Sequence, residues 1–274
     1  MLLENKSAIV YGAGGGIGGG VARTFAREGA KVFLVGRTLA KLEAVAADIR
    51  AAGGSAELAV VDATDEQAVN EHVRAVAARA GRVDVSMNLV SHGDADVGGY
   101  VQGIPLTDEP AADFLRPINK AVLANYNTAQ AAARQMVKQK SGAIVTLTNA
   151  GSKGAGPLMG STGVAAATIE GVVRQLASEV GVRGVRVLGL RIAAVPELWS
   201  PEIATHVFDW PPKAQPEGDG MGMVAILQKL ADMSMLHRPT TLAQVAGAAA
   251  FLASDLAGAM TGTFINVTGG MVPD

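Results

Sequence analysis

The chain has no cysteine and few aromatic residues, which make up only 4% of its 274 residues. Without cysteine it forms no disulfide, builds no thiolate zinc site and uses no cysteine nucleophile. Because the net charge is only −2 at pH 7, electrostatics gives no reason to expect nucleic-acid or anionic-membrane partners. The histidines and acids show no metal-ligand spacing such as His-Glu-x-x-His, so we expect no metal site.

Long uncharged hydrophobic runs are missing as well. No 18-residue apolar stretch is free of charge, which argues against a membrane span. The first seven residues include Glu4 and Lys6 and do not resemble a secretion signal, so we expect a cytoplasmic protein. Apolar residues nevertheless reach 49%, and a chain of this length can bury a substantial aliphatic core.

Short apolar runs alternate with segments of helical periodicity along the chain. Strands are predicted at 8–11, 31–35, 57–61, 83–87, 143–147, 185–191 and 263–267. Helices are predicted from residue 17 onward and at 39–52, 66–79, 111–138, 158–182 and 242–253. This alternation predicts an α/β fold with a Rossmann-type doubly wound parallel sheet, in a single domain over residues 1–274.

Residues 195–240 interrupt the alternation and are too long for an ordinary connector. They contain both tryptophans and several methionines, whose flexible side chains suit an adaptable apolar wall. Long loops at the carboxyl edge of such sheets often cover ligands, so we expect a substrate lid at about 195–240. An interface or a plain packing element is nearly as well supported.

Glycine is concentrated in Ser7–Gly20, where a predicted strand meets a predicted helix. Without a Cβ, glycine allows positive φ and a close approach of phosphate. The unpaired N–H groups at the start of the following helix then face that phosphate. The stretch therefore predicts a dinucleotide-binding turn rather than a flexible linker. The candidate cofactor-binding residues here are Gly12, Gly14, Gly15, Gly16, Ile17 and Gly18.

The second predicted strand is followed by Gly36, Arg37 and Thr38, with no acid. In a dinucleotide fold, an acid at this edge binds the 2′-hydroxyl of the adenosine ribose, whereas an arginine accommodates a 2′-phosphate. Arg37 can make a bidentate, charge-assisted contact to phosphate. We therefore predict that NADP(H) is preferred, with NAD(H) possible, although a solvated surface arginine would leave the same pattern.

The spacing Gly12-x-x-x-Gly16-x-Gly18 resembles the short-chain dehydrogenase/reductase family. The likeness continues over nearly the whole chain, and includes Leu236–Pro239, Phe251–Asp255, Thr261-Gly262 and Gly269-Gly270. It implies that Asp62 and Ala63 contact the adenine side of the cofactor and that Asn88 stands at the family's Asn-Asn-Ala-Gly motif. It also implies that Asn119 is the helical asparagine that holds a water in the family's proton relay.

The usual catalytic residues are replaced. The resemblance places Asn149 at the family's serine, Thr162 at its tyrosine and Ala166 at its lysine, and the thirteen-residue step from Asn149 to Thr162 matches the family. Threonine is a poor acid near neutrality, whereas the Asn149 amide could polarise a carbonyl or only satisfy a local turn. Our catalytic candidates are therefore Asn119, Asn149 and Thr162.

Five other residues, scattered along the chain, are candidate proton donors, but residues of these types are more often ordinary surface or packing residues. The five are His92, Tyr100, Tyr126, Lys153 and His206.

Three functions stay open. The first is an NADP(H)-dependent oxidoreductase with a degenerate catalytic tetrad, reducing a small carbonyl or imine-type substrate. The second is a catalytically silent dinucleotide-binding pseudoenzyme or sensor, and the third is a non-redox enzyme on the same fold. The resemblance also implies a homo-oligomer, a tetramer or dimer, built through the alanine-rich stretches Ala121–Met136 and Val164–Ala177.

Overall fold

The structure, a computed structural model, describes residues 1–90, 105–154, 160–198 and 223–274, and side chains from residue 227 in the last range. A seven-stranded sheet runs through its centre in the order β3-β2-β1-β4-β5-β6-β7. Every strand pair is parallel. The strands are β1 (Ser7–Tyr11), β2 (Lys31–Gly36), β3 (Ser55–Val60), β4 (Val85–Asn88), β5 (Gly142–Asn149), β6 (Val185–Ile192) and β7 (Phe264–Val267).

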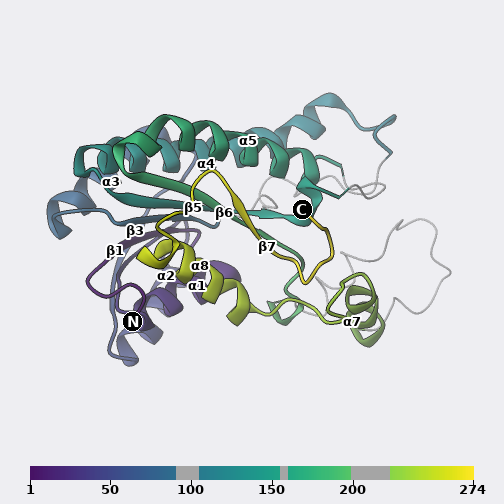
Figure 1. Ribbon diagram of the computed structural model, residues 1–274, viewed down its shortest axis with the longest axis horizontal. Coiled ribbons are helices and arrows are strands. Elements are labelled where there is room, and N and C mark those ends of the chain that lie inside the picture. The colour runs from purple at the N-terminus through teal and green to yellow at the C-terminus, as the bar shows by residue number, and fades with distance from the viewer. Residues whose placement is uncertain (91–104, 155–159, 199–222) are drawn as a thin grey trace.

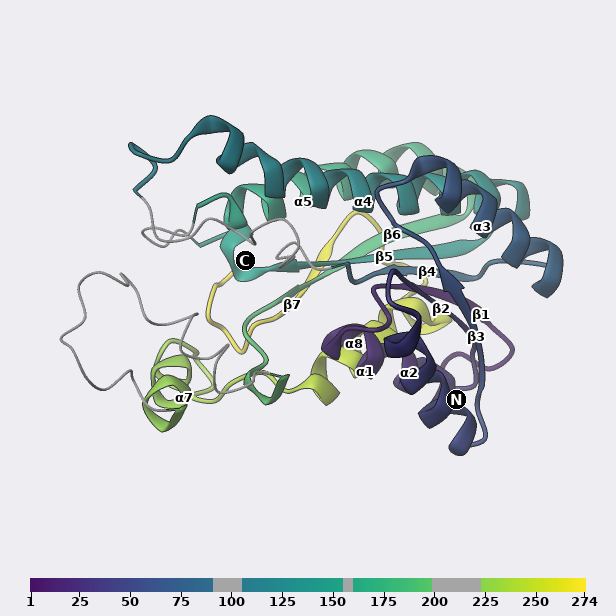
Figure 2. The ribbon, with the colours of Figure 1, turned by 180° about the vertical axis from the view of Figure 1, so that it is seen from behind.

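Helices cover both faces of the sheet (Figure 1). On one face lie α1 (Gly16–Arg27), α2 (Leu39–Ala51) and α8 (Leu242–Ala253). On the other lie α3 (Glu66–Ala80), α4 (Ala111–Gln139) and α5 (Thr162–Val180), as the reverse view in Figure 2 also shows. The predicted α/β doubly wound parallel fold is confirmed.

Strand β1 shows why the fold needs two covered faces. All five of its residues are buried. Successive side chains of a strand point to opposite faces, so Ala8 and Val10 join the core under α1, α2 and α8, while Ile9 and Tyr11 join the core under α3, α4 and α5. A run with apolar side chains on both faces, as at Ala8–Tyr11, is typical of a parallel sheet that helices cover on both sides.

The segment predicted as a lid contains helical structure that the sequence analysis did not predict. A short 3₁₀ turn, Pro196–Leu198, follows β6, and a helix, α7, spans Met223–Asp232. Leu230 of α7 is buried, 4% exposed, so the helix is packed at its end. The remainder of the expected lid, 199–222, lies outside the described residues.

The sheet order reverses between β1 and β4: the chain runs outward from β1 to β3 and then returns to the other side of β1. In open parallel sheets, the crevice at the carboxyl ends of strands on the two sides of such a point is the usual place for a ligand. None of the helices in the described ranges is long and apolar enough to span a bilayer.

Candidate active site

The glycine turn after β1 is held in one conformation by backbone contacts. Gly12 has a φ of +77°, and a Cβ there would lie 2.5 Å from the carbonyl oxygen of Leu89. A Cβ on Gly18 would lie 2.0 Å from the carbonyl oxygen of Gly12. No side chain caps the start of α1 at Gly15, so the first N–H groups of the helix are not used by a capping side chain. This geometry suits a bound phosphate.

A cleft of about 230 Å³ opens beside this turn. Six predicted cofactor residues line it: Gly12, Gly14, Gly15, Arg37, Asp62 and Ala63. Thr38, Lys41, Leu89, Val90 and Lys120 line it as well, and the sequence analysis had not proposed them as cofactor-binding residues. The other predicted residues, Gly16, Ile17, Gly18 and Asn88, are not in its lining, so direct cofactor contact by those four stays a prediction.

The described residues that line the cleft carry more positive than negative charge: they include Arg37, Lys41 and Lys120 against one acid, Asp62. Burial alone would raise the pKa of Asp62, but two hydrogen bonds from Thr64 and the charges of Arg37 and Lys120 lower it. The Thr64 backbone N–H and hydroxyl donate to Asp62 Oδ1 at 2.9 and 2.7 Å. Asp62 is therefore ionised and fixed in place at neutral pH, and the cations beside it favour an anionic ligand.

Asn88 has a supporting position under the cleft. It is 5% exposed, and its Nδ2 donates to the carbonyl oxygen of Ala124 at 3.0 Å and to Thr128 Oγ1 at 2.7 Å. Its Oδ1 accepts from the Val90 N–H at 2.9 Å. Asn88 thus ties the end of β4 to α4 and sets the course of Leu89 and Val90, which do line the cleft.

The structure places Asn119 away from the interface between α4 and α5. Its side chain is exposed, whereas Ala121, two residues and about 200° around the helix, is buried against Ala165 and Ile169 of α5. A different asparagine of α4, Asn125, is 5% exposed. Its Oδ1 accepts a hydrogen bond from Thr146 Oγ1 of β5, a contact the sequence analysis missed.

Asn149 and Thr162 come from two elements that touch each other. Asn149 Oδ1 accepts from the Gly151 N–H at 2.9 Å and caps the 3₁₀ turn η2 (Ala150–Ser152). A Cβ on Gly163 would lie 2.6 Å from the carbonyl oxygen of Gly151, so this turn meets the first turn of α5 backbone to backbone. The cap uses only the oxygen of Asn149, while polarising an acceptor would use its N–H₂ group.

Thr162 is the first residue of α5 and is 8% exposed. Ala166, one helical turn later, is fully buried. No ionisable side chain therefore stands at the two positions where the family resemblance puts its tyrosine and lysine.

Two of the five other candidate proton donors, Tyr126 and Lys153, lie in the described ranges, and neither is buried at the site. Tyr126 is exposed, and its hydroxyl accepts from Gln130 Nε2 at 2.7 Å. Lys153 is exposed as well. His92, Tyr100 and His206 lie outside the described residues. In the described part of the chain, no group of three or more metal-ligating side chains comes together.

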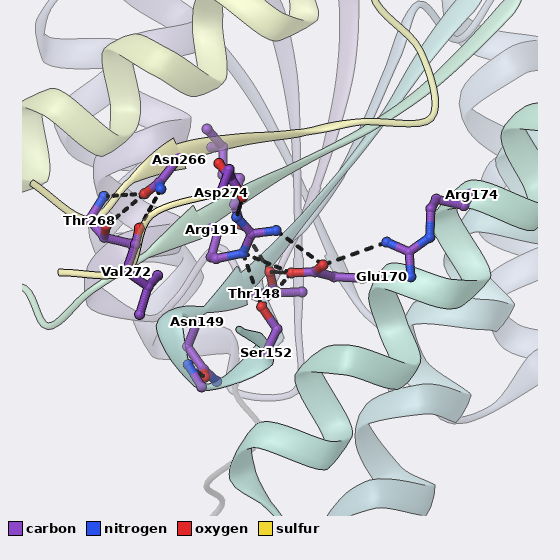
Figure 3. A network of polar contacts seen from close by, with 12 residues as sticks. Thr148, Asn149, Ser152, Glu170, Arg174, Arg191, Asn266, Thr268, Val272 and Asp274 are labelled. Atoms are coloured by element: carbon purple, nitrogen blue, oxygen red, sulfur yellow. Dashed lines mark hydrogen bonds and ion pairs between the residues drawn. The ribbon is translucent and has the colours of Figure 1, made fainter. Parts of the chain in front are cut away.

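A buried ionic network lies next to the turn that carries Asn149 (Figure 3). Glu170 of α5 and Arg191 of β6 are each 2% exposed, with Nε–Oε1 and Nη2–Oε2 distances of 3.0 and 3.1 Å. Ser152 Oγ donates to Glu170 at 2.5 Å, and Thr148 Oγ1 donates at 3.3 Å. Arg191 Nη1 also pairs with Asp274. The only sequence signal for this network was one acid and one arginine, each within an apolar run.

Comparison with known proteins gives matches along nearly the whole chain. The "short chain dehydrogenase" family model matches residues 6–196, and the "Enoyl-(Acyl carrier protein) reductase" model matches residues 213–272. The 7alpha-hydroxysteroid dehydrogenase of Escherichia coli strain K12 is 28% identical over 99% of this chain and 96% of its own. The A-factor type gamma-butyrolactone 1′-reductase of Streptomyces virginiae is 28% identical over 98% of this chain and 96% of its own.

Solved structures agree with the fold. An NAD+-bound xylitol dehydrogenase superposes with a TM-score of 0.84 at 24% identity, covering 98% of this chain and all of that one. A 7 alpha-hydroxysteroid dehydrogenase complexed with NADH and 7-oxo glycochenodeoxycholic acid superposes with a TM-score of 0.79 at 28% identity, covering 99% and 96%. The glycine turn, the cleft beside it and a family match over residues 6–196 together show that this chain belongs to the short-chain dehydrogenase/reductase family of NAD(P)H-dependent oxidoreductases that act on carbonyl and hydroxyl groups.

Proposed function

We propose that this protein is an NADP(H)-dependent reductase of a small carbonyl or imine-type substrate, and that it does not use the family's tyrosine–lysine pair as its proton source. The observation that carries the cofactor preference is the cleft at the end of β2. There Arg37 and Lys41 line the wall, and Asp62 is the only acid among the described residues of the lining.

Different residues of the cleft would bind different parts of the cofactor. The N–H groups at the start of α1 would hold the pyrophosphate, since Gly12 and Gly18 keep the backbone open there. Arg37, with Lys41 beside it, would hold the 2′-phosphate, because a guanidinium pairs with phosphate in a bidentate way. Asp62 would face the adenosine. When bound, the dinucleotide supplies the hydride.

Proton supply distinguishes this chain from its relatives. A threonine hydroxyl at 162 is a weak acid, and the buried Ala166 carries no charge to strengthen it. An acceptor that arrives already protonated, such as an iminium, needs no acid from the protein. The Asn149 N–H₂ group could orient or polarise the acceptor. This reasoning favours imine-type substrates over simple ketones.

The cofactor part is tested by equilibrium titration of NADPH and NADH. We expect the native protein to bind NADPH more tightly and Arg37→Ala to erase most of the preference. A charge-assisted phosphate contact contributes about 1.5–3 kcal/mol, roughly 10- to 100-fold in affinity. Arg183→Ala, at an exposed arginine outside the cleft, is the matched control and should bind like the native protein. Equal affinities of the native protein for both cofactors would refute the preference.

The reaction is tested with panels of small ketones, aldehydes and cyclic imines, following NADPH absorbance. We expect turnover of an imine or an activated carbonyl, and little or no turnover of simple ketones. Brisk reduction of simple ketones would contradict the assignment of Thr162 and Ala166. Tight NADPH binding with no turnover on either panel would favour the alternative of a dinucleotide-binding sensor, which the loss of ionisable groups at 162 and 166 already makes reasonable.

A further inference from the structure

Glu170 and Arg191 form an ion pair that is almost completely removed from water, each being 2% exposed. Burying two charges is costly unless good geometry and additional hydrogen bonds satisfy them. Here the pair makes two contacts at 3.0 and 3.1 Å, and two hydroxyls donate to the carboxylate. Burial alone would raise the pKa of Glu170, but the Arg191 and Ser152 hydrogen bonds lower it, so the carboxylate stays charged at neutral pH.

The pair joins segments that are far apart in the chain. Arg191 Nε also donates to Ser152 Oγ at 3.0 Å, so both members of the pair hold the hydroxyl at the end of η2. Thr148, the residue before Asn149, donates to the same Glu170 oxygen as Ser152. The turn that carries Asn149 is therefore held at both ends by one buried pair, as Figure 3 shows.

The end of the chain completes the arrangement. Asp274 pairs with Arg191 Nη1, and its side chain is 49% exposed, so it is the most accessible acid of the network. Asn266 Nδ2 donates to the Val272 carbonyl oxygen at 2.7 Å. Val272 in turn packs so closely on the turn that a Cβ on Gly154 would lie 3.0 Å from its Cγ1. Residues 272–274 thus lie against the loop that follows Asn149.

We propose that Glu170 and Arg191 are positioning residues for the acceptor end of the site, and that Asp274 secures the same pair from the solvent side. They fix the turn Asn149–Ser152 against the first turn of α5, so they set where the Asn149 amide stands relative to the cofactor. Among the described residues, none of the three lines the cleft at β2. This inference rests on the proposed function, because it assumes a nicotinamide near Asn149.

The test uses Glu170→Gln, which removes the charge and keeps the shape, and Asp274→Asn, which weakens the exposed partner. Glu179→Gln, at an exposed acid of the same helix, is the matched control. Hydrogen exchange reports on the turn through the backbone N–H groups of Gly151, which donates to Asn149 Oδ1, and of Gly154, which donates to the Ala150 carbonyl oxygen. We expect these amides to exchange at least tenfold faster in Glu170→Gln, severalfold faster in Asp274→Asn, and unchanged in the control.

Two nucleotide probes separate positioning from general loss of structure. Adenosine 2′,5′-bisphosphate, which occupies only the adenine half, should bind Glu170→Gln within about twofold of native. The fluorescence of bound NADPH, which reports on the nicotinamide, should change in intensity and maximum. Glu170→Asp should restore part of the native signal, because it returns the charge.

Native exchange rates together with native NADPH fluorescence in Glu170→Gln would overturn the inference. An equal loss of affinity for both nucleotides would also overturn it, because the pair would then support only the fold as a whole. If Glu170→Gln does not fold, Asp274→Asn decides the matter by the same readouts. If the native protein binds neither nucleotide, the proposed function fails, while the exchange rates still show whether the pair holds the turn.

Discussion

His72 predicts a specific loss of stability in mild acid. It lies on the buried side of α3, is 7% exposed, and neither of its ring nitrogens has a hydrogen-bond partner among the described residues. Its ring meets Tyr11 edge to face, with centroids 6.1 Å apart. Burial, with a smaller contribution from the positive charge of Arg79, lowers the pKa of His72 from 6.5 to about 4.

The direction and size of this loss of stability follow from the linkage between protonation of His72 and unfolding. A histidine whose pKa is depressed in the folded state is protonated in the unfolded chain first, so acid favours unfolding between pH 6.5 and about 4. The difference between 6.5 and about 4 corresponds to an upper limit of about 3 kcal/mol. The linkage relation gives almost no loss of unfolding free energy at pH 7.5, about 1 kcal/mol at pH 5.5 and about 2–3 kcal/mol at pH 4.5.

The assay is urea unfolding at pH 7.5, 6.5, 5.5 and 4.5 for the native protein and His72→Phe, which keeps a flat ring beside Tyr11. Carboxylates titrate in both proteins, so the difference between the two unfolding free energies isolates His72. Between pH 7.5 and 5.5 this difference should shift by about 1 kcal/mol in favour of the variant. His237→Asn is the control, because His237 is exposed and its φ of +49° suits asparagine. Parallel curves for the native protein and His72→Phe would refute the reasoning.

Further predictions concern the turn, the proton relay and assembly. Gly18→Ala should abolish NADPH binding and cost about 2–4 kcal/mol in unfolding free energy, because its Cβ would lie 2.0 Å from a carbonyl oxygen. Gly171→Ala, within α5 with nothing within 4 Å, should instead be neutral or stabilising by about 0.5–1 kcal/mol in the same urea titration. The double variant Thr162→Tyr with Ala166→Lys should raise ketone reduction by roughly 10²–10⁴-fold if the pocket accepts the ketone; a variant that binds NADPH yet gains no activity on the ketones and aldehydes of the panel would count against intact hydride geometry. We also expect a dimer or tetramer by light scattering at micromolar concentration, since Leu123, Tyr126 and Val164 are 45–47% exposed on α4 and α5. A monomeric mass would contradict this, and Val164→Glu should shift an oligomer toward smaller species.

Much of the fold can be predicted from local sequence patterns. The buried run of β1, the glycine cluster after it and the periodic apolar positions of the helices depend on residues close in sequence, so their elements could be predicted within a few residues. The Arg37 edge could be found in the same way, because it directly follows a strand whose role in the fold is known once the turn is recognised.

Other features depend on which segments meet in space. Lys41 and Lys120 join Arg37 in one cleft although Lys120 is on α4. The face of α4 that meets α5 carries Ala121 and leaves Asn119 exposed. Counting positions along the sequence did not reveal which face of α4 is turned toward α5. Helix α7 was missed within a stretch rich in proline and glycine.

The sequence by itself determined the alternating strands and helices, the glycine turn and the absence of a tyrosine and a lysine at 162 and 166, because these are properties of composition and short-range spacing. Only the tertiary structure decided that Glu170, Arg191 and Asp274 form one network, since they are separated by 21 and 83 residues. A buried charge is tolerated only where its partners converge, and convergence of distant segments follows from packing of the whole sheet and its helices rather than from any local pattern.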